Sequence, residues 1–295
     1  MSNSRNKSHP MLVISIVTLI LLALAALIVY FSGYRYIRAE NAKFSGWVKN
    51  NQPYSGKIKY TNGTSAELSK SKDGNLTLKF STGDIYEGDL KGIVRHGKGK
   101  ITYKKGNVYE GDFVDDRRTG HAKITYADGS SYVGDVVDGI PHGSGLYTFS
   151  PDSYYFGQLN MGAKDGVGEY RYSDGSYYIG TYQNDLRHGT EICTVPLADG
   201  SVYTGKCYMK FSTGATYIGD FINDVRTGQG TFTWESGEKY TGAFVGGLFH
   251  GNGVYTYTDG TTLSATFENG KIPDVSVKMS SNNSDNSQIS IESAE

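Results

Sequence analysis

Apolar and polar positions alternate along most of the chain after residue 40. Residues 99–103 (GKITY) and 109–113 (YEGDF) both show this pattern. A period of two is typical of β-strands with one buried face. Asp-Gly pairs such as Asp128-Gly129 separate these stretches, and they favour tight hairpin turns because glycine adopts positive φ at little cost. The pattern therefore predicts successive β-hairpins and no helix after residue 40.

The hairpins recur with a period of 23 residues. A tyrosine begins each unit and a glycine follows it two positions later, and two further glycine columns keep the same register. The tyrosines are Tyr86, Tyr109, Tyr132, Tyr155 and Tyr178, then Tyr203 and Tyr217 after steps of 25 and 14, and Tyr240 after a further 23. Self-similarity of this kind predicts a solenoid in which each repeat contacts its neighbours.

The alternation also assigns the two faces of the predicted sheet. Tyr109, Gly111 and Phe113 point to one side, and Glu110 and Asp112 point to the other. A glycine between two rings leaves a gap, and a ring on the neighbouring strand can cover it. One face is therefore expected to be aromatic and glycine-rich, and the other charged.

An apolar run precedes the hairpins. As a helix, residues 11–31 would extend roughly 30 Å and span a bilayer. Residues 23–25 (ALA) resemble a cleavage site, but the apolar run continues past them, which favours a retained signal-anchor. The positive residues that follow favour a cytosolic repeat domain, whereas the short N-terminal tail favours export. These membrane-proximal basic residues are Arg35, Arg38, Lys43 and Lys49.

These patterns predict a single-pass membrane protein with an exported repeat domain, and a cytosolic orientation stays open. The expected divisions are a short polar tail (1–10), a transmembrane signal-anchor helix (11–31), a basic juxtamembrane region with degenerate capping repeats (32–79), the repeat array (80–273) and a disordered Ser/Asn-rich tail (274–295). The array carries a net charge of −6 and the whole chain −1. Such a balance gives no attraction to nucleic acid.

The pattern Tyr-x-Gly-x-Phe, then His-Gly-x-Gly, then a turn glycine resembles the MORN repeat (membrane occupation and recognition nexus). The best copies run over residues 86–99 and 240–253. The resemblance implies a curved single-layer antiparallel sheet with an aromatic-lined groove, used for scaffolding, dimerisation or membrane association. The expected fold class is therefore an all-β repeat, an elongated single-layer curved antiparallel sheet of stacked hairpins of about 23 residues, preceded by one transmembrane helix.

The array is irregular between Thr190 and Gly214. Tyr178 and Tyr217 lie 39 residues apart, where two repeats would take 46. Both cysteines fall here, and Cys193 and Cys207 flank a predicted turn, nearly opposite each other. Such a placement brings the two side chains close to disulfide distance. An exported domain would allow a disulfide; the alternative is two small core side chains.

The apparent catalytic and metal-binding motifs lack the residues or the spacing that these functions require. Residues 92–99 resemble a phosphate-binding loop but lack its Ser/Thr, and a strand follows where a helix is needed. His96, His142 and His188 lie 46 residues apart, which is roughly 19 Å across four strands, too far for a shared metal. We therefore expect no enzyme, cofactor or metal.

The favoured function is a non-catalytic, membrane-anchored scaffold that presents an aromatic-lined groove to a protein partner or to a second copy. Alternatives are association with an anionic lipid surface through the repeats and the basic stretch, binding of cell-wall carbohydrate, and rings that merely pack against one another. The candidate groove residues are Tyr86, Tyr109, Phe113, Tyr132, Tyr155, Tyr178, Tyr182, Tyr217, Phe221, Tyr240 and Phe244.

Overall fold

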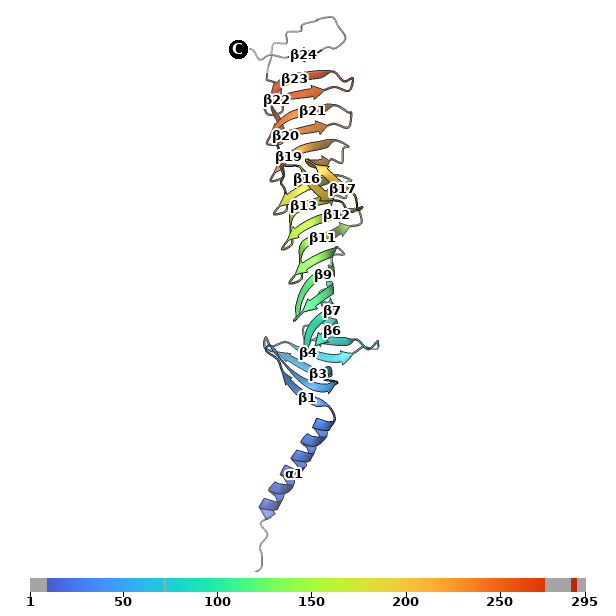
Figure 1. Cartoon of the computed structure of the whole chain (residues 1–295), viewed down its shortest axis with the longest axis vertical. Helices are drawn as coiled ribbons and strands as arrows, with labels where there is room; N and C mark the ends of the chain where they lie inside the picture. Colours follow the sequence, from blue (N-terminus) through green and yellow to red (C-terminus); the bar gives the residue numbers. More distant parts are fainter. Residues whose placement is uncertain (1–9, 72, 274–287, 291–295) are drawn as a thin grey trace, which may run out of the picture. The chain divides into compact units, whose positions relative to one another are not determined.

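The structure, a computed structural model, describes residues 10–71, 73–273 and 288–290 (Figure 1). The chain divides into two compact units, Met1–Arg117 and Arg118–Glu295. Each unit contains antiparallel strands that pair in chain order as stacked hairpins of a single curved sheet. The expectation of an all-β repeat is confirmed.

Helix α1 (Pro10–Phe31) precedes the first strand. Its side chains are described from residue 18 on. A bilayer core is about 30 Å thick, and among the described residues no helix is long and apolar enough to cross it. The transmembrane signal-anchor at 11–31, and with it the single-pass membrane localisation, is therefore wrong.

The predicted basic residues lie on the two strands that follow this helix. Arg38, Lys43 and Lys49 are exposed. The guanidinium of Arg35 lies 4.5 Å from the ring centre of Tyr30, and its Nη1 donates to the main-chain oxygen of Tyr30 at 2.8 Å. Arg35 thus packs against the end of the helix.

Unit 1 forms one run of antiparallel neighbours from β1 to β8. Its strands are β1 (Tyr34–Arg38), β2 (Ala42–Lys49), β3 (Gln52–Tyr60), β4 (Ser65–Lys70), β5 (Leu76–Phe80), β6 (Ile85–Lys91), β7 (Val94–Thr102) and β8 (Val108–Val114).

Unit 2 begins within β9 and continues the same hairpin pattern. Its strands are β9 (Arg117–Thr125), β10 (Ser131–Val137), β11 (Ile140–Ser150), β12 (Ser153–Asn160), β13 (Ala163–Arg171), β14 (Tyr177–Gln183), β15 (Leu186–Arg187), β16 (Cys193–Pro196), β17 (Val202–Gly205), β18 (Cys207–Lys210), β19 (Thr216–Ile222), β20 (Val225–Thr233), β21 (Lys239–Val245), β22 (Leu248–Thr256), β23 (Thr262–Phe267) and β24 (Gln288–Ser290). β24 pairs parallel with β23. The rest of the predicted disordered tail, from residue 274 on, lies outside the described residues.

The core of each regular repeat is a tyrosine ring that covers two glycines. Gly134 and Gly145 face each other on β10 and β11. A Cβ built on Gly145 would lie 2.4 Å from the ring of Tyr132, so only glycine fits beneath this ring. The same arrangement recurs under Tyr86, Tyr155, Tyr217 and Tyr240. The predicted covering of strand glycines by a ring from the neighbouring strand is confirmed.

Each covering tyrosine also compensates for a β-bulge. The pairing of β10 with β11 shifts between Gly134 and Val136, which leaves Asp135 without a partner on that side. The hydroxyl of Tyr132 donates to the main-chain oxygen of Asp135 at 2.7 Å, and so satisfies a polar group that the ladder has left out. Equivalent bonds run from the other tyrosines to the residue three positions on.

One repeat of unit 2 carries an inserted hairpin. β15 pairs with the end of β14 through Tyr182↔Arg187, whereas β18 pairs with its beginning through Tyr178↔Met209. Residues 186–189 and 207–210 thus share one strand position between β14 and β19, because Gly189 bridges Phe221 and β18 pairs with β19. The irregularity that looked like two shortened repeats is one repeat interrupted by residues 190–205.

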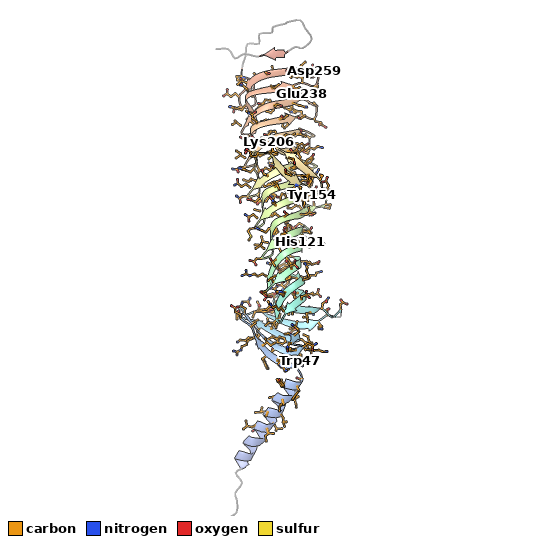
Figure 2. The ribbon with its side chains drawn as sticks, in the orientation of Figure 1. Trp47, His121, Tyr154, Lys206, Glu238 and Asp259 are labelled. Atoms are coloured by element: carbon orange, nitrogen blue, oxygen red, sulfur yellow. The ribbon has the colours of Figure 1, made fainter. Side chains whose placement is uncertain are left out.

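The inserted hairpin, β16 and β17, forms a separate two-stranded sheet (Figure 1). It packs on the charged side of β13, where Glu169 is 1% exposed and Val195 is fully buried. The main-chain nitrogen of Ala198 donates to Oε2 of Glu169 at 3.0 Å, and Nε of Arg171 donates to Oε1 at 2.6 Å. Tyr154, labelled in Figure 2, also donates to Oε1, at 3.2 Å. The buried carboxylate is therefore hydrogen-bonded and paired, as burial requires.

The two cysteines lie in different parts of this arrangement. Cys193, on β16, pairs with Gly205, whereas Cys207, on β18, pairs with Gly219 in the main sheet. Both thiols are free. Cys207 takes the strand position that a glycine holds in the regular repeats, with its Sγ beside Gly180. The candidate disulfide is not formed in this structure.

We expect Gly145→Ala to lower the free energy of unfolding by about 1–3 kcal/mol, because the added Cβ overpacks the ring of Tyr132. Ser144→Ala is the matched control: Ser144 is exposed on the other face, and the change should stay within about 0.5 kcal/mol. Urea unfolding of the full chain measures both. Equal stability of the two variants would contradict the ring-on-glycine account.

We expect the chain to fold without the inserted hairpin. Deleting residues 190–205 joins Gly189 to Lys206 and restores the 23-residue spacing of Tyr178 and Tyr217. The free energy of unfolding should fall by about 1–3 kcal/mol, largely from the lost burial around Val195. Deleting the 16 residues 144–159 instead should abolish cooperative unfolding, because it destroys the strand register. If both deletions unfold the protein, the hairpin is part of the sheet's continuity and not an insertion.

Candidate functional site

The predicted groove residues form the core of the array. All eleven are at most 5% exposed, and seven tyrosines among them are at most 1% exposed. Their rings meet edge to face: Phe221 lies 5.4 Å from Tyr178 and 5.2 Å from Tyr217, with ring planes almost perpendicular. Phe113, Tyr182 and Phe244 hold the same relation to their neighbouring tyrosines. A partner-binding role for these rings stays a prediction, but a partner would meet other side chains first.

Burial shapes the electrostatics of this core. It raises the pKa of Tyr132, Tyr155 and Tyr217 well above the usual value near 10, because the charged form loses its hydration, and nearby carboxylates add to the effect. The folded state therefore holds these phenols neutral.

A second aromatic column lies on the same face and is more exposed. Each member lies two residues after the residue paired with a core tyrosine, just before the hairpin turn; Phe149, for example, follows Tyr147, the partner of Tyr132. Phe149 is 42% exposed. The column consists of Phe80, Tyr103, Tyr126, Phe149, Tyr172, Phe211, Trp234 and Tyr257.

In unit 2 this column joins its neighbours into a row of contacting rings, here called the aromatic strip: Tyr126, Tyr147, Phe149, Tyr170 and Tyr172. The ring centres are 5.6, 4.5, 5.4 and 4.3 Å apart in that order, and three of the four contacts are stacked. Burial raises the pKa of Tyr126 to about 12. The strip is a continuous, half-buried aromatic surface with polar hydroxyls along it.

A row of cations lies on the same face, at the opposite end of the strands. Lys164 places its Nζ 5.6 Å from the ring centre of Tyr170, and Arg187 places its Cζ 5.3 Å from that of Phe221. Both are within the range of a cation–π contact. In unit 2 the row consists of Arg118, Lys164, Arg187 and Arg226, and in unit 1 Arg95 takes the corresponding position in the repeat.

Carboxylates from the following turn neutralise several of these cations. Asp185 accepts hydrogen bonds from the main-chain nitrogen of Lys164 and pairs with its Nζ at 3.1 Å. Burial raises the pKa of Asp185, but these bonds outweigh it and hold the pKa below its usual value. The same balance holds the pKa of Asp224 low beside Arg187.

The histidine column makes contacts between repeats. Nδ1 of His142 accepts a hydrogen bond from the main-chain nitrogen of Met161, and Nδ1 of His188 lies 3.3 Å from Oδ1 of Asn223. Nδ1 of His96 lies 3.4 Å from Oδ1 of Asp115. Within the described residues, no group of three or more His, Cys, Asp or Glu side chains could hold a metal ion.

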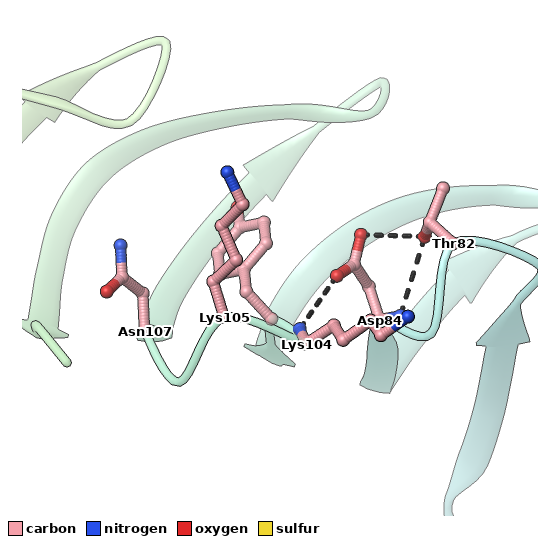
Figure 3. Close-up of a pocket in the computed structure, with 6 residues that line it drawn as sticks. Thr82, Asp84, Lys104, Lys105 and Asn107 are labelled. Atoms are coloured by element: carbon pink, nitrogen blue, oxygen red, sulfur yellow. Dashed lines mark hydrogen bonds between the residues drawn. The ribbon is translucent and has the colours of Figure 1, made fainter.

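A hollow of about 340 Å³ lies between two hairpin turns of unit 1 (Figure 3). Oδ1 of Asp84 accepts a hydrogen bond from the main-chain nitrogen of Lys104 at 2.9 Å, and Oδ2 accepts one from the hydroxyl of Thr82 at 2.8 Å. The carboxylate thus ties one turn to the next, which explains the hollow as part of the repeat stacking.

Sequence reasoning missed the aromatic strip and the cation row, although both keep the repeat spacing. The strip members Tyr126, Phe149 and Tyr172 lie 23 residues apart, and a cation stands two positions before the second glycine column, as in Arg187 before Gly189. The period could have found both. Their exposure required the structure.

The repeat pattern matches the MORN repeat over residues 86–108, 109–131, 132–154, 155–177, 178–190, 217–239 and 240–262. Comparison with curated protein sequences gives no match. The gap between residues 190 and 217 contains the inserted hairpin, so the matched segments and the structure agree on where the repeat is interrupted.

Solved structures give weak likenesses. The TCP domain of Drosophila melanogaster SAS-4 (dCPAP), in complex with a proline-rich motif of Ana2 (dSTIL), aligns with 68% of this chain and 90% of its own, at 12% identity and a TM-score of 0.28. The TCP10 domain of Danio rerio CPAP, in complex with a STIL peptide, aligns with 79% and 99%, at 16% identity and a TM-score of 0.19. At these TM-scores neither structure bears on the function of this chain.

Each of the seven matched segments begins at a core tyrosine that covers glycines or contacts the rings beside it. Together the segments span just over half of the chain. The chain therefore belongs to the MORN-repeat family.

Proposed function

We propose that the repeat array is a non-catalytic interaction module that binds a segment of a protein partner along the aromatic strip. The observation that carries this proposal is the strip itself, a run of five contacting rings of which Phe149 is 42% exposed. Contiguous exposed apolar surface marks sites of interaction more often than scattered apolar residues do.

The composition of the strip suits protein recognition. Tyrosine offers a large contact area with few rotatable bonds and a hydroxyl that can accept or donate. The rings of the strip also support one another through stacking, so little side-chain entropy is left to lose on binding. A partner segment laid across the hairpins would meet these rings before it reached the buried core tyrosines.

Charge favours a protein partner over the lipid alternative. The array carries a net charge of −6, which repels anionic headgroups, and the membrane-spanning helix that would have held it at a bilayer is not found among the described residues. No contact among the residues that the structure describes favours carbohydrate. Binding of a second copy uses the same surface and is distinguished by measuring the mass in solution.

The test is selection of binders from a displayed library of random twelve-residue peptides, followed by affinity measurement on the full chain. We expect Phe149→Ala combined with Tyr172→Ala to weaken the selected peptides at least tenfold, about 1.4 kcal/mol. Val133→Ala is the matched control, because Val133 is exposed on the other face of β10. It should leave affinity unchanged.

Selected peptides that bind the Phe149→Ala/Tyr172→Ala variant as tightly as the parent protein would remove the strip as the binding surface. Sedimentation equilibrium on the same variants separates self-association: a dimer that dissociates with these substitutions would mean that the partner is a second copy.

A further inference from the structure

Two members of the cation row, Arg118 and Arg226, lack the turn aspartate that accompanies the other three. Three repeats share the same pair of contacts between a turn aspartate and the cation. The main-chain nitrogen of the aspartate donates to the main-chain oxygen of the cationic residue, and the aspartate carboxylate forms an ion pair with that residue's side chain. For Arg187 and Asp224 the distances are 2.9 Å from the Asp224 nitrogen to the Arg187 oxygen, and 2.7 Å from Nε of Arg187 to Oδ1 of Asp224. Arg95 with Asp116 and Lys164 with Asp185 repeat it.

At Arg226 a glycine stands in the place of that aspartate. The main-chain nitrogen of Gly247 donates to the main-chain oxygen of Arg226 at 3.0 Å, as in the other repeats. Nη2 of Arg226 donates to the main-chain oxygen of Gly247 at 2.9 Å. Among the described residues no carboxylate forms an ion pair with Arg226.

The space for a carboxylate is open at this position. A Cβ built on Gly247 would have one atom within 4 Å, Nη2 of Arg226 at 3.9 Å. The contrast is Gly139, which occupies the same place beside Arg118: a Cβ there would lie 2.3 Å from Nε of Arg118, because the guanidinium has moved into the space. A glycine at this position is therefore not enough to leave the space empty. The space beside Gly247 is empty because the Arg226 guanidinium packs against aromatic rings and does not occupy it.

Rings hold Arg226 in that position. Its Cζ lies 5.2 Å from the ring centre of Phe232, 5.6 Å from that of Tyr217 and 5.7 Å from that of Phe244. Burial lowers the pKa of Arg226, and the neighbouring Arg187 acts in the same direction. A half-buried cation of this kind gains from a carboxylate that replaces its lost hydration.

We propose that Arg226 is a binding site for a carboxylate of an acidic peptide segment, an Asp or Glu side chain of the protein partner. The carboxylate occupies the place beside Gly247 that Asp224 occupies beside Arg187. The partner supplies from outside the group that the other repeats supply internally, which gives the array a preference for acidic sequences at this repeat. This inference rests on the proposed function, binding of a protein segment on the same face.

Further aromatic side chains adjoin Phe232, one of the rings that contact Arg226, and define what can accompany the carboxylate. Trp234 and Phe249 are both half-buried, and their ring centres lie 5.7 Å apart. Phe232 lies 4.9 Å from Trp234. An apolar side chain next to the acidic residue would pack against these rings, so the segment recognised is an acidic residue beside an apolar one.

The test uses two fluorescein-labelled peptides, Ser-Gly-Asp-Leu-Gly-Ser and its twin with Asn in place of Asp, and fluorescence anisotropy on the full chain. We expect the Asp peptide to bind at least about tenfold more tightly than the Asn twin, because only the charged side chain forms the charge-assisted bidentate contact. Arg226→Gln should remove the difference between the two peptides.

Gly247→Asp tests the same site without removing the cation. Asp116, Asp185 and Asp224 adopt φ of 68°, 69° and 67°, close to the 78° of Gly247, so an aspartate fits this backbone. The variant supplies the internal carboxylate, and we expect it to fold, to be at least as stable as the parent in urea, and to lose the preference for the Asp peptide. Arg118→Gln, a cation of the same row whose adjoining space is filled, should keep the preference.

Equal affinity for the Asp and Asn peptides, a lack of binding by both, or an unchanged preference in Gly247→Asp would overturn the carboxylate site. The library selection that tests the aromatic strip depends on Phe149 and Tyr172 and not on Arg226. The strip can therefore pass its test while the carboxylate site fails, and the two results are separable.

Discussion

The fold depends on one contact, the tyrosine ring laid over a pair of facing glycines. A single-layer sheet has no second layer to bury its apolar face, so each repeat must build its core within two strands. Tyr132 does this over Gly134 and Gly145, and its hydroxyl reaches the main-chain oxygen that the bulge at Asp135 leaves unpaired. The strand glycine columns follow from this contact.

That contact also decides which surface is left for recognition. The core tyrosines are buried in the packing of the sheet. The rings that remain partly exposed are those just before the hairpin turns, such as Phe149. The cations at the other end of the strands are mostly neutralised by the next turn, and Arg226 is the member whose carboxylate place is open. Binding capacity thus arises where a repeat departs from the regular pattern.

The sequence was sufficient to predict the hairpins, their period and the ring-on-glycine packing, because all three are local and repeat many times. It did not reveal that Tyr132 and its equivalents are fully buried, since alternation assigns a face but not its exposure. It also suggested two shortened repeats around Cys193, where a hairpin is inserted into one repeat. The insertion is visible only from the pairing of Tyr178 with Met209, two residues that lie 31 positions apart in the sequence. The apolar run at 11–31 predicted a membrane helix that the described residues do not contain.

The most direct test of the central contact is a spectrophotometric titration of tyrosine between pH 8 and 13, with circular dichroism recorded in parallel. Burial raises the pKa of Tyr86, Tyr132, Tyr155, Tyr178, Tyr217 and Tyr240. The stability that these neutral phenols contribute is fully present below pH 10 and is lost as pH rises further. The account predicts that they ionise only as the sheet unfolds; ionisation of all tyrosines near pH 10 with the sheet intact would contradict it.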